Sequence, residues 1–337
     1  MTANPVLPGP VLPGIAEIKA AAARLSGLAI ETPLLESLAL NERFGARLLF
    51  KPEVLQRTGS FKFRGAYNKI STLSPDERSR GVVAFSSGNH AQGVAASAAM
   101  FGIEAVIVMP SDAPAMKIGN VRRMGAEVVL YDRNREDRAV IAQPYVDKGM
   151  ALVPPYDDPA IIAGQGTIGL ELVAQAEKLG ARLDAVVIPC GGGGLTGGIS
   201  VAVKHGSPAT QVWAAEPEYF DDTRRSLAGG VRVANEPGHT SICDALLSPE
   251  PGAITFEINR KTLAGSIAVS QKAVASAMRD AMAYLKLVVE PGGSVALAAL
   301  SSGEIDIKGK TIAVVLSGGN VDFGLYADIL ASRPPYD

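Results

Sequence analysis

The chain alternates short apolar segments with longer amphipathic ones, and this alternation constrains its fold more than any other feature. Seven β-branched runs bounded by glycine, proline or polar residues are typical of buried strands, at residues 47–51, 81–85, 105–109, 127–131, 185–189, 211–215 and 311–316. Stretches of helical length lie between them, at residues 91–101, 116–125, 159–179 and 271–289. Because parallel strands need such crossovers, the pattern predicts an α/β fold of open, mostly parallel sheets flanked by helices.

Composition excludes several classes of protein. With 337 residues, 47% of them hydrophobic and 20% charged, the chain is long enough for two domains and too apolar to be disordered. A net charge of -2 provides no field that would attract nucleic acid or an acidic membrane. No apolar run reaches about 18 residues and the first residues lack a secretory signal, so we expect a cytoplasmic protein without membrane contacts. Two cysteines and three scattered histidines show neither zinc-ligand spacing nor a disulfide framework.

Four consecutive glycines, residues 191–194, follow the predicted strand at residues 185–189 and precede a helix that begins near Leu195. Glycine in ordered structure costs backbone entropy, so such a run indicates a need for bare backbone. Backbone N–H groups at a helix N-terminus bind phosphate well, because they also lie at the positive end of the helix dipole. The loop therefore predicts a phosphate site, and a tight turn without a ligand is the alternative.

The same loop also fits a dinucleotide-binding pattern. Gly192, Gly194 and Gly197 satisfy G-x-G-x-x-G, and Glu216 lies 19 residues beyond Gly197, after the next predicted strand. An acidic residue at this point can bind a ribose hydroxyl. A nicotinamide-dependent dehydrogenase is therefore an alternative from a different class.

Three further segments carry polar side chains at places where α/β proteins bind ligands. Residues 58–66, TGSFKFRGA, place Lys62 between aromatic residues, where desolvation lowers the pKa of an amine towards nucleophilic use. Residues 86–90, SSGNH, and residues 317–320, SGGN, each follow a predicted strand. A surface lysine and two ordinary helix caps would explain the same residues without any chemistry.

These motifs, in this order, resemble those of the pyridoxal-phosphate (PLP) enzymes of the tryptophan-synthase-β fold type, also called fold type II. Within this group the chain is similar to the threonine/serine dehydratases and serine racemase, from about residue 15 to the end, including residues 154–159, 163–167 and 290–291. The resemblance implies a two-domain fold with a small mobile domain at residues 53–152. The large PLP-binding domain would contain residues 1–52 and 153–337, with residues 1–14 as a mobile arm. It also implies a homodimer or homotetramer.

The resemblance implies a role for each motif residue. Lys62 would hold the cofactor as a Schiff base and move the substrate α-proton, and Ser87 would act as acid or base on the opposite face. Phe61 would pack on the ring, Asn89 would bond its 3-hydroxyl, and Ser317 would face the pyridine nitrogen. The cofactor phosphate would be held by Gly191, Gly192, Gly193, Gly194 and Leu195. The substrate carboxylate would be held by Ser86, Ser87, Asn89 and His90, together with residues 58–60.

The implied reaction is β-elimination from a β-hydroxy amino acid, L-threonine or L-serine first, to a 2-oxo acid and ammonia. Ser87 matches serine racemase, so racemisation is an alternative. Residues 241–245, SICDA, differ from the TIADG usual in dehydratases, so a bulkier or acidic substrate such as phenylserine or 3-hydroxyaspartate is another. A catalytically inactive binding module remains a further alternative.

Residues 216–222, EPEYFDD, resemble the divalent-cation loop of serine racemase. The resemblance implies that Glu216 and Asp222 bind Mg²⁺ or Ca²⁺ through their side chains and Phe220 through its carbonyl. Oxygen ligands are those that both cations prefer. A solvated acidic loop without a metal is the alternative.

Overall fold

The computed structural model of the protein describes residues 11–332 apart from residues 87, 114 and 134. Its strands form a six-stranded sheet in the order β1-β2-β10-β7-β8-β9 and a four-stranded sheet in the order β5-β4-β3-β6. β1 pairs with β2 in antiparallel orientation and the other neighbouring strands are parallel. The strands are β1 (Leu35–Glu36), β2 (Arg47–Pro52), β3 (Val82–Phe85), β4 (Ala105–Pro110), β5 (Glu127–Tyr131), β6 (Ala151–Leu152), β7 (Ala185–Pro189), β8 (Gln211–Pro217), β9 (Gly265–Val269) and β10 (Thr311–Leu316).

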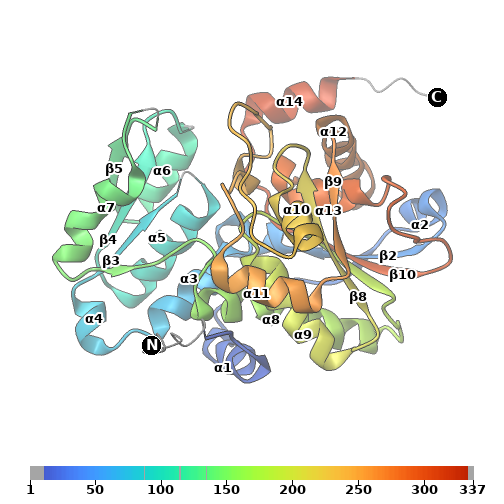
Figure 1. Ribbon diagram of the computed structural model, residues 1–337, viewed down its shortest axis with the longest axis horizontal. Coiled ribbons are helices and arrows are strands. Elements are labelled where there is room, and N and C mark those ends of the chain that lie inside the picture. The colour runs from blue at the N-terminus through green and yellow to red at the C-terminus, as the bar shows by residue number, and fades with distance from the viewer. Residues whose placement is uncertain (1–10, 87, 114, 134, 333–337) are drawn as a thin grey trace, which may run out of the picture.

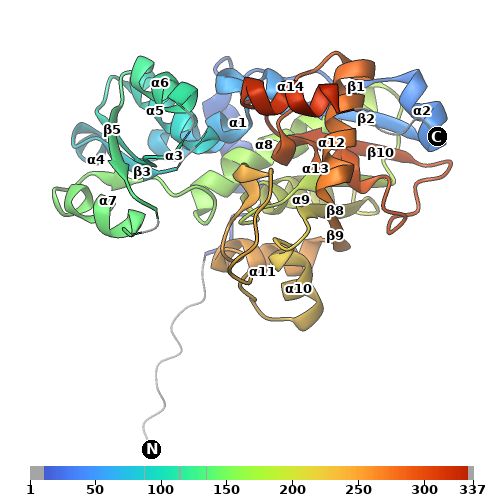
Figure 2. The same cartoon turned by 90° about the horizontal axis from the view of Figure 1, so that it is seen from above.

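Helices cover both sheets and form two lobes, the smaller of them around β3, β4 and β5 (Figures 1 and 2). The helices are α1 (Ile15–Leu25), α2 (Leu38–Phe44), α3 (Lys62–Ser71), α4 (Pro75–Ser79), α5 (Asn89–Phe101), α6 (Ala115–Arg123), α7 (Arg138–Asp147), α8 (Pro159–Lys178), α9 (Gly194–Gly206), α10 (Asp222–Gly229), α11 (Ala253–Thr262), α12 (Gln271–Asp280), α13 (Pro291–Ala299) and α14 (Phe323–Ala331). Short turns are η1 (Glu53–Leu55), η2 (Arg57–Gly59), η3 (Asp244–Leu246) and η4 (Ala281–Leu285). In the part of the chain that is described, no helix is both long and apolar enough to cross a membrane.

The predicted fold class is confirmed, and each of the seven predicted strands is present. Ser74 and Asp158 accept hydrogen bonds from first-turn N–H groups, as expected of capping residues before a proline. Gly102, Gly125 and Gly180 follow their helices with left-handed φ angles of 65°, 86° and 60°. The smaller sheet takes its strands from residues 82–152, whereas the domain limits near residues 52 and 153 stay a prediction.

The predicted helix at residues 271–289 is wrong in its second half. α12 ends at Asp280, a π-helical turn follows, and Lys286 takes a left-handed conformation with φ 59°. Glu290 then lies in an extended conformation directly before Pro291. The residue that precedes a proline avoids the helical region, so the chain is already extended when α13 begins.

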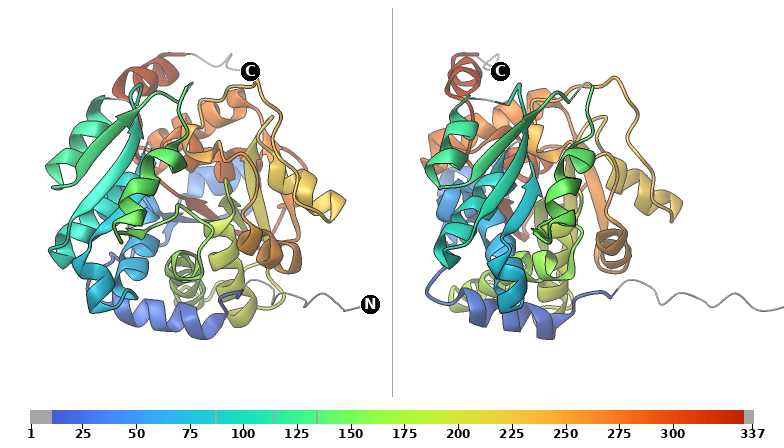
Figure 3. Two further views of the ribbon diagram at one scale, coloured as in Figure 1. Left: turned by 60° about the vertical axis from the view of Figure 1, so that its left-hand side comes forward. Right: turned by 90° about the vertical axis from the view of Figure 1, so that its left-hand side faces the viewer.

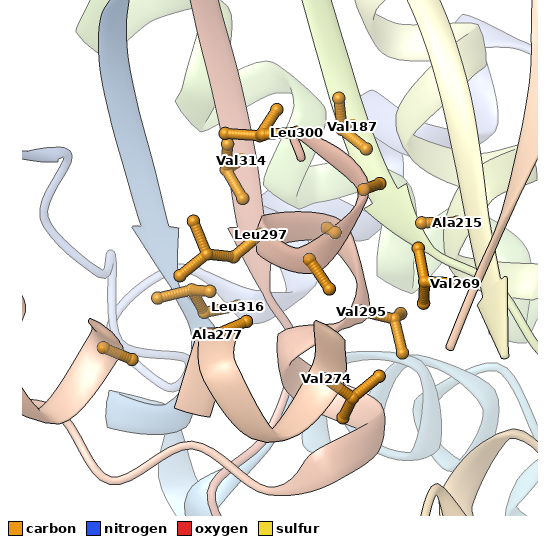
Figure 4. Packing of buried hydrophobic residues seen from close by; sticks show 14 of the residues in the cluster. Val187, Ala215, Val269, Val274, Ala277, Val295, Leu297, Leu300, Val314 and Leu316 are labelled. Atoms are coloured by element: carbon orange, nitrogen blue, oxygen red, sulfur yellow. The ribbon is translucent and has the colours of Figure 1, made fainter. Parts of the chain in front are cut away.

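The core of the larger lobe lies between its sheet and helices α12 and α13. Figure 4 shows Val295 and Leu297 of α13 among side chains of β7 and β10, including Val187 and Leu316. These residues are almost completely buried. Their burial holds β7 and β10 side by side, so that the loops after both strands leave the same edge of the sheet.

α3 and α8 join the two lobes, and α1 packs beneath α8 (Figure 3). α3 lies so close to α8 that a Cβ atom on Gly164 would be 2.7 Å from the carbonyl oxygen of Arg64. Arg64 is itself buried and forms an ion pair with Glu53 at 2.8 Å. The helix that begins with Lys62 is therefore firmly seated on α8.

Candidate active site

A cavity of about 150 Å³ lies at the carboxyl ends of β3, β7 and β10. Ligands of open α/β sheets bind at this edge, and a cavity of this size holds a six-membered ring. The structure brings to its wall nearly all the residues predicted to bind cofactor or substrate: Phe61, Lys62, Ser86, Asn89, His90, Gly191, Gly192, Gly193, Gly194, Leu195 and Ser317. Ser87, on which the prediction of racemisation depends, lies outside the described residues.

Lys62 begins α3 and points its amine at the cavity wall. Its Nζ atom donates to the carbonyl oxygen of Pro155 at 2.6 Å and lies 5.1 Å from the ring centroid of Phe61. Burial lowers the pKa of Lys62 to about 8, although the nearby Glu290 opposes the change. An amine with this pKa is partly neutral near pH 7, so it can attack a carbonyl group or accept a proton.

The glycine loop presents backbone donors to the cavity. Gly193 has a left-handed φ of 91° and is the N-cap of α9. The carbonyl oxygens of Gly192 and Gly193 accept from side chains behind the loop, with Thr255 Oγ1 at 2.6 Å and Asn259 Nδ2 at 3.4 Å. Within the described residues, no acceptor lies within hydrogen-bond distance of the N–H groups of residues 191–196. Free donors at the start of a helix form an anion site of the kind that binds phosphate.

Packing around the same loop leaves no space for side chains. A Cβ atom on Gly192 would lie 2.4 Å from the ring of Tyr156, and one on Gly193 would lie 2.7 Å from Asn259 Nδ2. The glycines thus allow Tyr156, on the cavity wall, and α11, behind the loop, to pack closely against it. This close packing restricts the conformations that the loop can adopt.

The N-terminus of α5, in the smaller lobe, contributes a second set of donors to the cavity wall. Gly88 donates its N–H to Ser86 Oγ at 3.2 Å, and the N–H groups of residues 89–91 have no acceptor in the described chain. The side chain of Asn89 accepts from Asn320 Nδ2 at 2.8 Å and donates to Glu290. The cavity wall therefore contains one donor-rich helix end from each lobe.

His90 lines the cavity, but its ring is turned to the protein backbone. Its Nε2 atom lies 2.8 Å from the carbonyl oxygen of Val153, and burial lowers the pKa of the ring to about 3, with the charge of Lys62 contributing. The ring is neutral near pH 7 and is turned to the backbone of Val153. His90 can therefore contribute to anion binding through its backbone N–H, and not through a charged ring.

Ser317 follows β10 and is 4% exposed. Its carbonyl oxygen accepts from the N–H of Phe61 at 3.1 Å, which fixes the two segments to each other. Its hydroxyl has no hydrogen-bond partner among the residues that the structure describes, so it is available to a ligand in the cavity. A hydroxyl can face a ring nitrogen without supplying a negative charge.

Glu216 and Asp222 are fully buried, so the solvated acidic loop is wrong for these two residues. Glu216 accepts from the N–H groups of Thr223 and Arg224 at 2.9 Å each and from Ser266 Oγ at 2.6 Å. It does not line the cavity, which argues against a ribose-binding role. Burial raises its pKa to about 8, and it raises that of Asp222 to about 6.

One of the two carboxylate oxygens of Asp222 has no hydrogen-bond partner among the described residues. Its Oδ1 atom accepts from Asn235 Nδ2 at 2.7 Å, whereas Oδ2 is buried with no hydrogen-bond partner among the described residues. No hydrogen bond to the carbonyl oxygen of Phe220 occurs among the described residues, so this oxygen remains a possible ligand. No group of three His, Cys, Asp or Glu residues suited to a metal occurs in the described chain, and a cation here would depend on backbone oxygen.

Several residues on the cavity wall were not identified from the sequence: Lys117, Arg138, Tyr156, Gln165, Asp244 and Glu290. Lys117 and Asp244 form an ion pair at 2.6 Å that joins α6 to η3, although 127 residues separate them in the chain. Nothing in the local sequence indicates such a pair. Four of the six, namely Tyr156, Gln165, Asp244 and Glu290, lie in segments that we singled out, but no pattern assigned these side chains to the cavity.

Comparisons with known proteins agree with the geometry. The model of the family described as "Pyridoxal-phosphate dependent enzyme" matches residues 25–318. The chain is 40% identical over 325 residues to the L-threo-3-hydroxyaspartate ammonia-lyase of Saccharomyces cerevisiae, covering 96% of this chain and 98% of that one. It is 42% identical to the L-threonine ammonia-lyase of Thermotoga maritima, covering 93% and 77%. The structure of maize serine racemase superposes with a TM-score of 0.89 at 35% identity, covering 94% and 97%.

Proposed function

Because the chain belongs to the family of pyridoxal-phosphate dependent enzymes, we propose that its cavity carries out β-elimination from a β-hydroxy amino acid, releasing a 2-oxo acid and ammonia. The observation that carries the proposal is that Lys62 lines the same cavity as two sets of free backbone donors. One set suits the phosphate of the cofactor and the other suits the carboxylate of the substrate. Relatives named ammonia-lyases act on amino acids of this class.

The residues present fit pyridoxal phosphate. The free N–H groups of the glycine loop would hold its phosphate, Asn89 and Ser317 would bind polar atoms of its ring, and Phe61 would contact the ring. When bound, the cofactor supplies an electron-withdrawing group that acidifies the α-hydrogen of the substrate. The low pKa of Lys62 keeps part of its amine neutral, so Nζ can attach the cofactor and later accept the α-proton. The N–H groups at the start of α5 would hold the substrate carboxylate.

Replacing Lys62 tests this assignment. Lys62→Ala should lose the visible absorbance of the lysine-bound cofactor and reduce threonine deamination by at least about 10⁴-fold, because it removes both covalent attachment and the proton-accepting amine. Lys261→Ala, which changes an exposed lysine of α11, is the matched control and should behave like the native enzyme. A Lys62→Ala protein that still forms a borohydride-reducible adduct with the cofactor would place the attachment site elsewhere.

Arg138 favours an acidic substrate as a second candidate. It begins α7, lines the cavity, and has its guanidinium 5.0 Å from the ring centroid of Phe85. Among the described residues it has no ion-pair partner, whereas Lys117 is already paired with Asp244. A guanidinium that is not neutralised by the protein can bind a second carboxylate on the substrate. We therefore propose 3-hydroxyaspartate as a substrate alongside threonine and serine.

The substrate preference of Arg138→Gln tests this second candidate. We expect kcat/KM for L-threo-3-hydroxyaspartate to fall by about 100-fold and that for L-threonine to change by less than about 3-fold, because only the acidic substrate loses a charge-assisted hydrogen bond. Arg78→Gln is the matched control, since Arg78 also lies over a phenylalanine ring but outside the cavity. Equal losses for both substrates would assign Arg138 a structural role.

We also propose that Glu216, Asp222 and the Phe220 carbonyl hold Mg²⁺ or Ca²⁺ as a structural cation. Two buried carboxylates with raised pKa values and one unpaired oxygen fit an ion that would replace their protons. The site lies behind the glycine loop, because Thr223, which binds Glu216, also contacts Cys190 Sγ at 3.3 Å. A bound cation would stabilise this part of the larger lobe.

A further inference from the structure

A chain of side-chain hydrogen bonds runs along the cavity wall from Thr58 to Glu290. Asn320 Nδ2 donates to the carbonyl oxygen of Thr58 at 2.7 Å and to Asn89 Oδ1 at 2.8 Å. Asn89 Nδ2 in turn donates to Glu290 Oε1 at 2.5 Å. A backbone carbonyl can only accept, so Asn320 must present its amide nitrogen, and Asn89 must receive it with its amide oxygen. The orientation of the Asn89 amide is therefore set by its neighbours.

The chain of bonds connects segments that are far apart in the sequence. Asn89 begins α5 beside the smaller sheet, whereas Glu290 precedes α13 and Asn320 follows β10 in the larger lobe. Thr58 has a left-handed φ of 63°, which is unfavourable for a threonine. The bond from Asn320 helps to hold this turn, which leads directly to Lys62.

Two glycines lie directly against the chain of bonds. A Cβ atom on Gly318 would lie 2.3 Å from Glu290 Oε1, and one on Gly59 would lie 2.7 Å from Asn320 Oδ1. A side chain at either position would therefore displace the polar side chain beside it. The second N–H of Asn89 Nδ2 is left for the cavity, whose wall Asn89 forms.

Glu290 is the member of the chain that can change its charge. It is 2% exposed, and Oε2 is a buried atom without a hydrogen-bond partner among the described residues. The charged groups that act on it are Asp244, Lys117 and Lys62. Burial, followed by Asp244, raises the pKa of Glu290 to about 7. A buried carboxylate without an ion pair is costly, so the neutral acid is favoured at and below neutral pH.

We propose that Asn320 and Glu290 are positioning residues that fix the amide of Asn89 so that it donates to the 3-oxygen of the cofactor ring, and that Glu290 makes this contact sensitive to charge. The inference rests on the proposed role of Asn89 in cofactor binding. Neither Asn320 nor Glu290 needs to touch the substrate. Both act through the direction in which Asn89 donates.

Cofactor affinity of the apoenzyme tests the positioning role. Asn89→Ala should weaken the Kd for pyridoxal phosphate by about 10-fold, since it removes one hydrogen bond to the ring. Asn320→Asp should weaken it by a similar factor with Asn89 intact, because an aspartate accepts and so forces the Asn89 amide to turn. Asn320→Ser, which can still donate one hydrogen bond to Asn89, should recover most of the affinity.

The outcomes separate the two hypotheses. If Asn89→Ala leaves the Kd unchanged, the proposed role of Asn89 is wrong and the inference fails with it. If Asn89→Ala weakens binding but Asn320→Asp does not, Asn89 binds the cofactor without help and the positioning role is overturned. Melting of each apoprotein shows whether a loss of affinity comes from unfolding, and Asn320→Ser provides the comparison if Asn320→Asp does not fold.

The absorbance of the holoenzyme tests the role of Glu290 independently. Glu290→Gln keeps an oxygen that accepts from Asn89, so the Kd should stay within about 3-fold of native. The native visible spectrum should change between pH 6 and 8, and Glu290→Gln should remove this change, because no other member of the chain of bonds titrates there. Glu42→Gln, at an exposed position of α2, is the matched control. A Glu290→Gln spectrum with the native pH dependence would overturn the charge-sensitive role.

Discussion

Two helix N-termini, one from each lobe, line the cavity, and they present their backbone donors in different ways. The end of α9 is a run of glycines whose carbonyl oxygens are bound from behind by Thr255 and Asn259. The end of α5 instead carries polar side chains, among them Ser86 and Asn89, and its donors follow Gly88. Both ends can bind an anion, but only α9 does so with bare backbone.

The difference indicates what each end binds. A backbone without side chains fits one group closely and cannot adapt, which suits a cofactor phosphate that is the same in every turnover. Side chains such as Asn89 add contacts that depend on the shape and polarity of the ligand. The α5 end therefore suits the substrate and the polar edge of the cofactor ring. A substitution at the α9 end should therefore change mainly the affinity for the cofactor. A substitution at the α5 end should change mainly how the stability of the protein depends on pH.

The largest expected effect is at the α9 end. Gly193→Ala should weaken the Kd for pyridoxal phosphate by about 100-fold, because the new Cβ would collide with Asn259 and the left-handed backbone disfavours alanine. Gly180→Ala is the matched control, since Gly180 is also left-handed but has open space around it. Equilibrium titration of the two apoproteins measures the difference. Equal affinities would mean that the glycine loop is a turn and not the phosphate site.

A moderate effect is expected at the α5 end, where acid should lower the stability of the folded protein through His90. The pKa of His90 is about 3 in the folded protein and near 6.5 in an unfolded chain, mainly because the ring is buried. Between these two pH values His90 is protonated in the unfolded state and neutral in the folded state. The stability of the folded protein should therefore fall as pH drops from about 6.5 towards 3. The melting temperature measured between pH 7 and pH 5 gives the size of this fall.

His90→Gln should reduce the acid-dependent fall in melting temperature, because glutamine does not titrate. His205→Gln, which changes an exposed histidine of α9, should keep the native pH dependence. If both variants lose stability between pH 7 and pH 5 as steeply as the native protein does, groups other than His90 are responsible. The α5 end would then be no more sensitive to acid than the α9 end.

The same contrast between the two ends explains what could be predicted from the sequence. The α9 end is contiguous, and its need for bare backbone appears directly as residues 191–194, so both the loop and its donors were predicted. The α5 segment was found as a polar cluster after a strand, but the neutral, buried ring of His90 depends on Val153, 63 residues away. Tertiary packing decides which residues become such partners, so a local sequence pattern cannot predict them.

The parts of the fold that were missed have a similar explanation. β1 and β6 are two residues long, too short for any alternation to be visible. β9 begins with Gly265 and Ser266, which weaken its β-branched pattern. Glu290 belongs to a Glu-Pro pair that the family resemblance included. Its hydrogen bond with Asn89, however, forms only where the two lobes meet.

The smallest expected effect concerns the cation behind the α9 end. Millimolar Mg²⁺ or Ca²⁺ should raise the melting temperature of the chelator-treated protein by about 3 °C, because an ion that binds only the folded state stabilises it by mass action. Asp222→Asn should remove this gain, and Asp221→Asn should keep it, since Asp221 is partly exposed and already paired with Arg225. The cation should also strengthen cofactor binding at the glycine loop, through Thr223 and Cys190, and leave substrate KM unchanged. A melting curve that is indifferent to chelator and to both cations would leave Glu216 as a purely structural carboxylate, held by the backbone N–H groups that start α10.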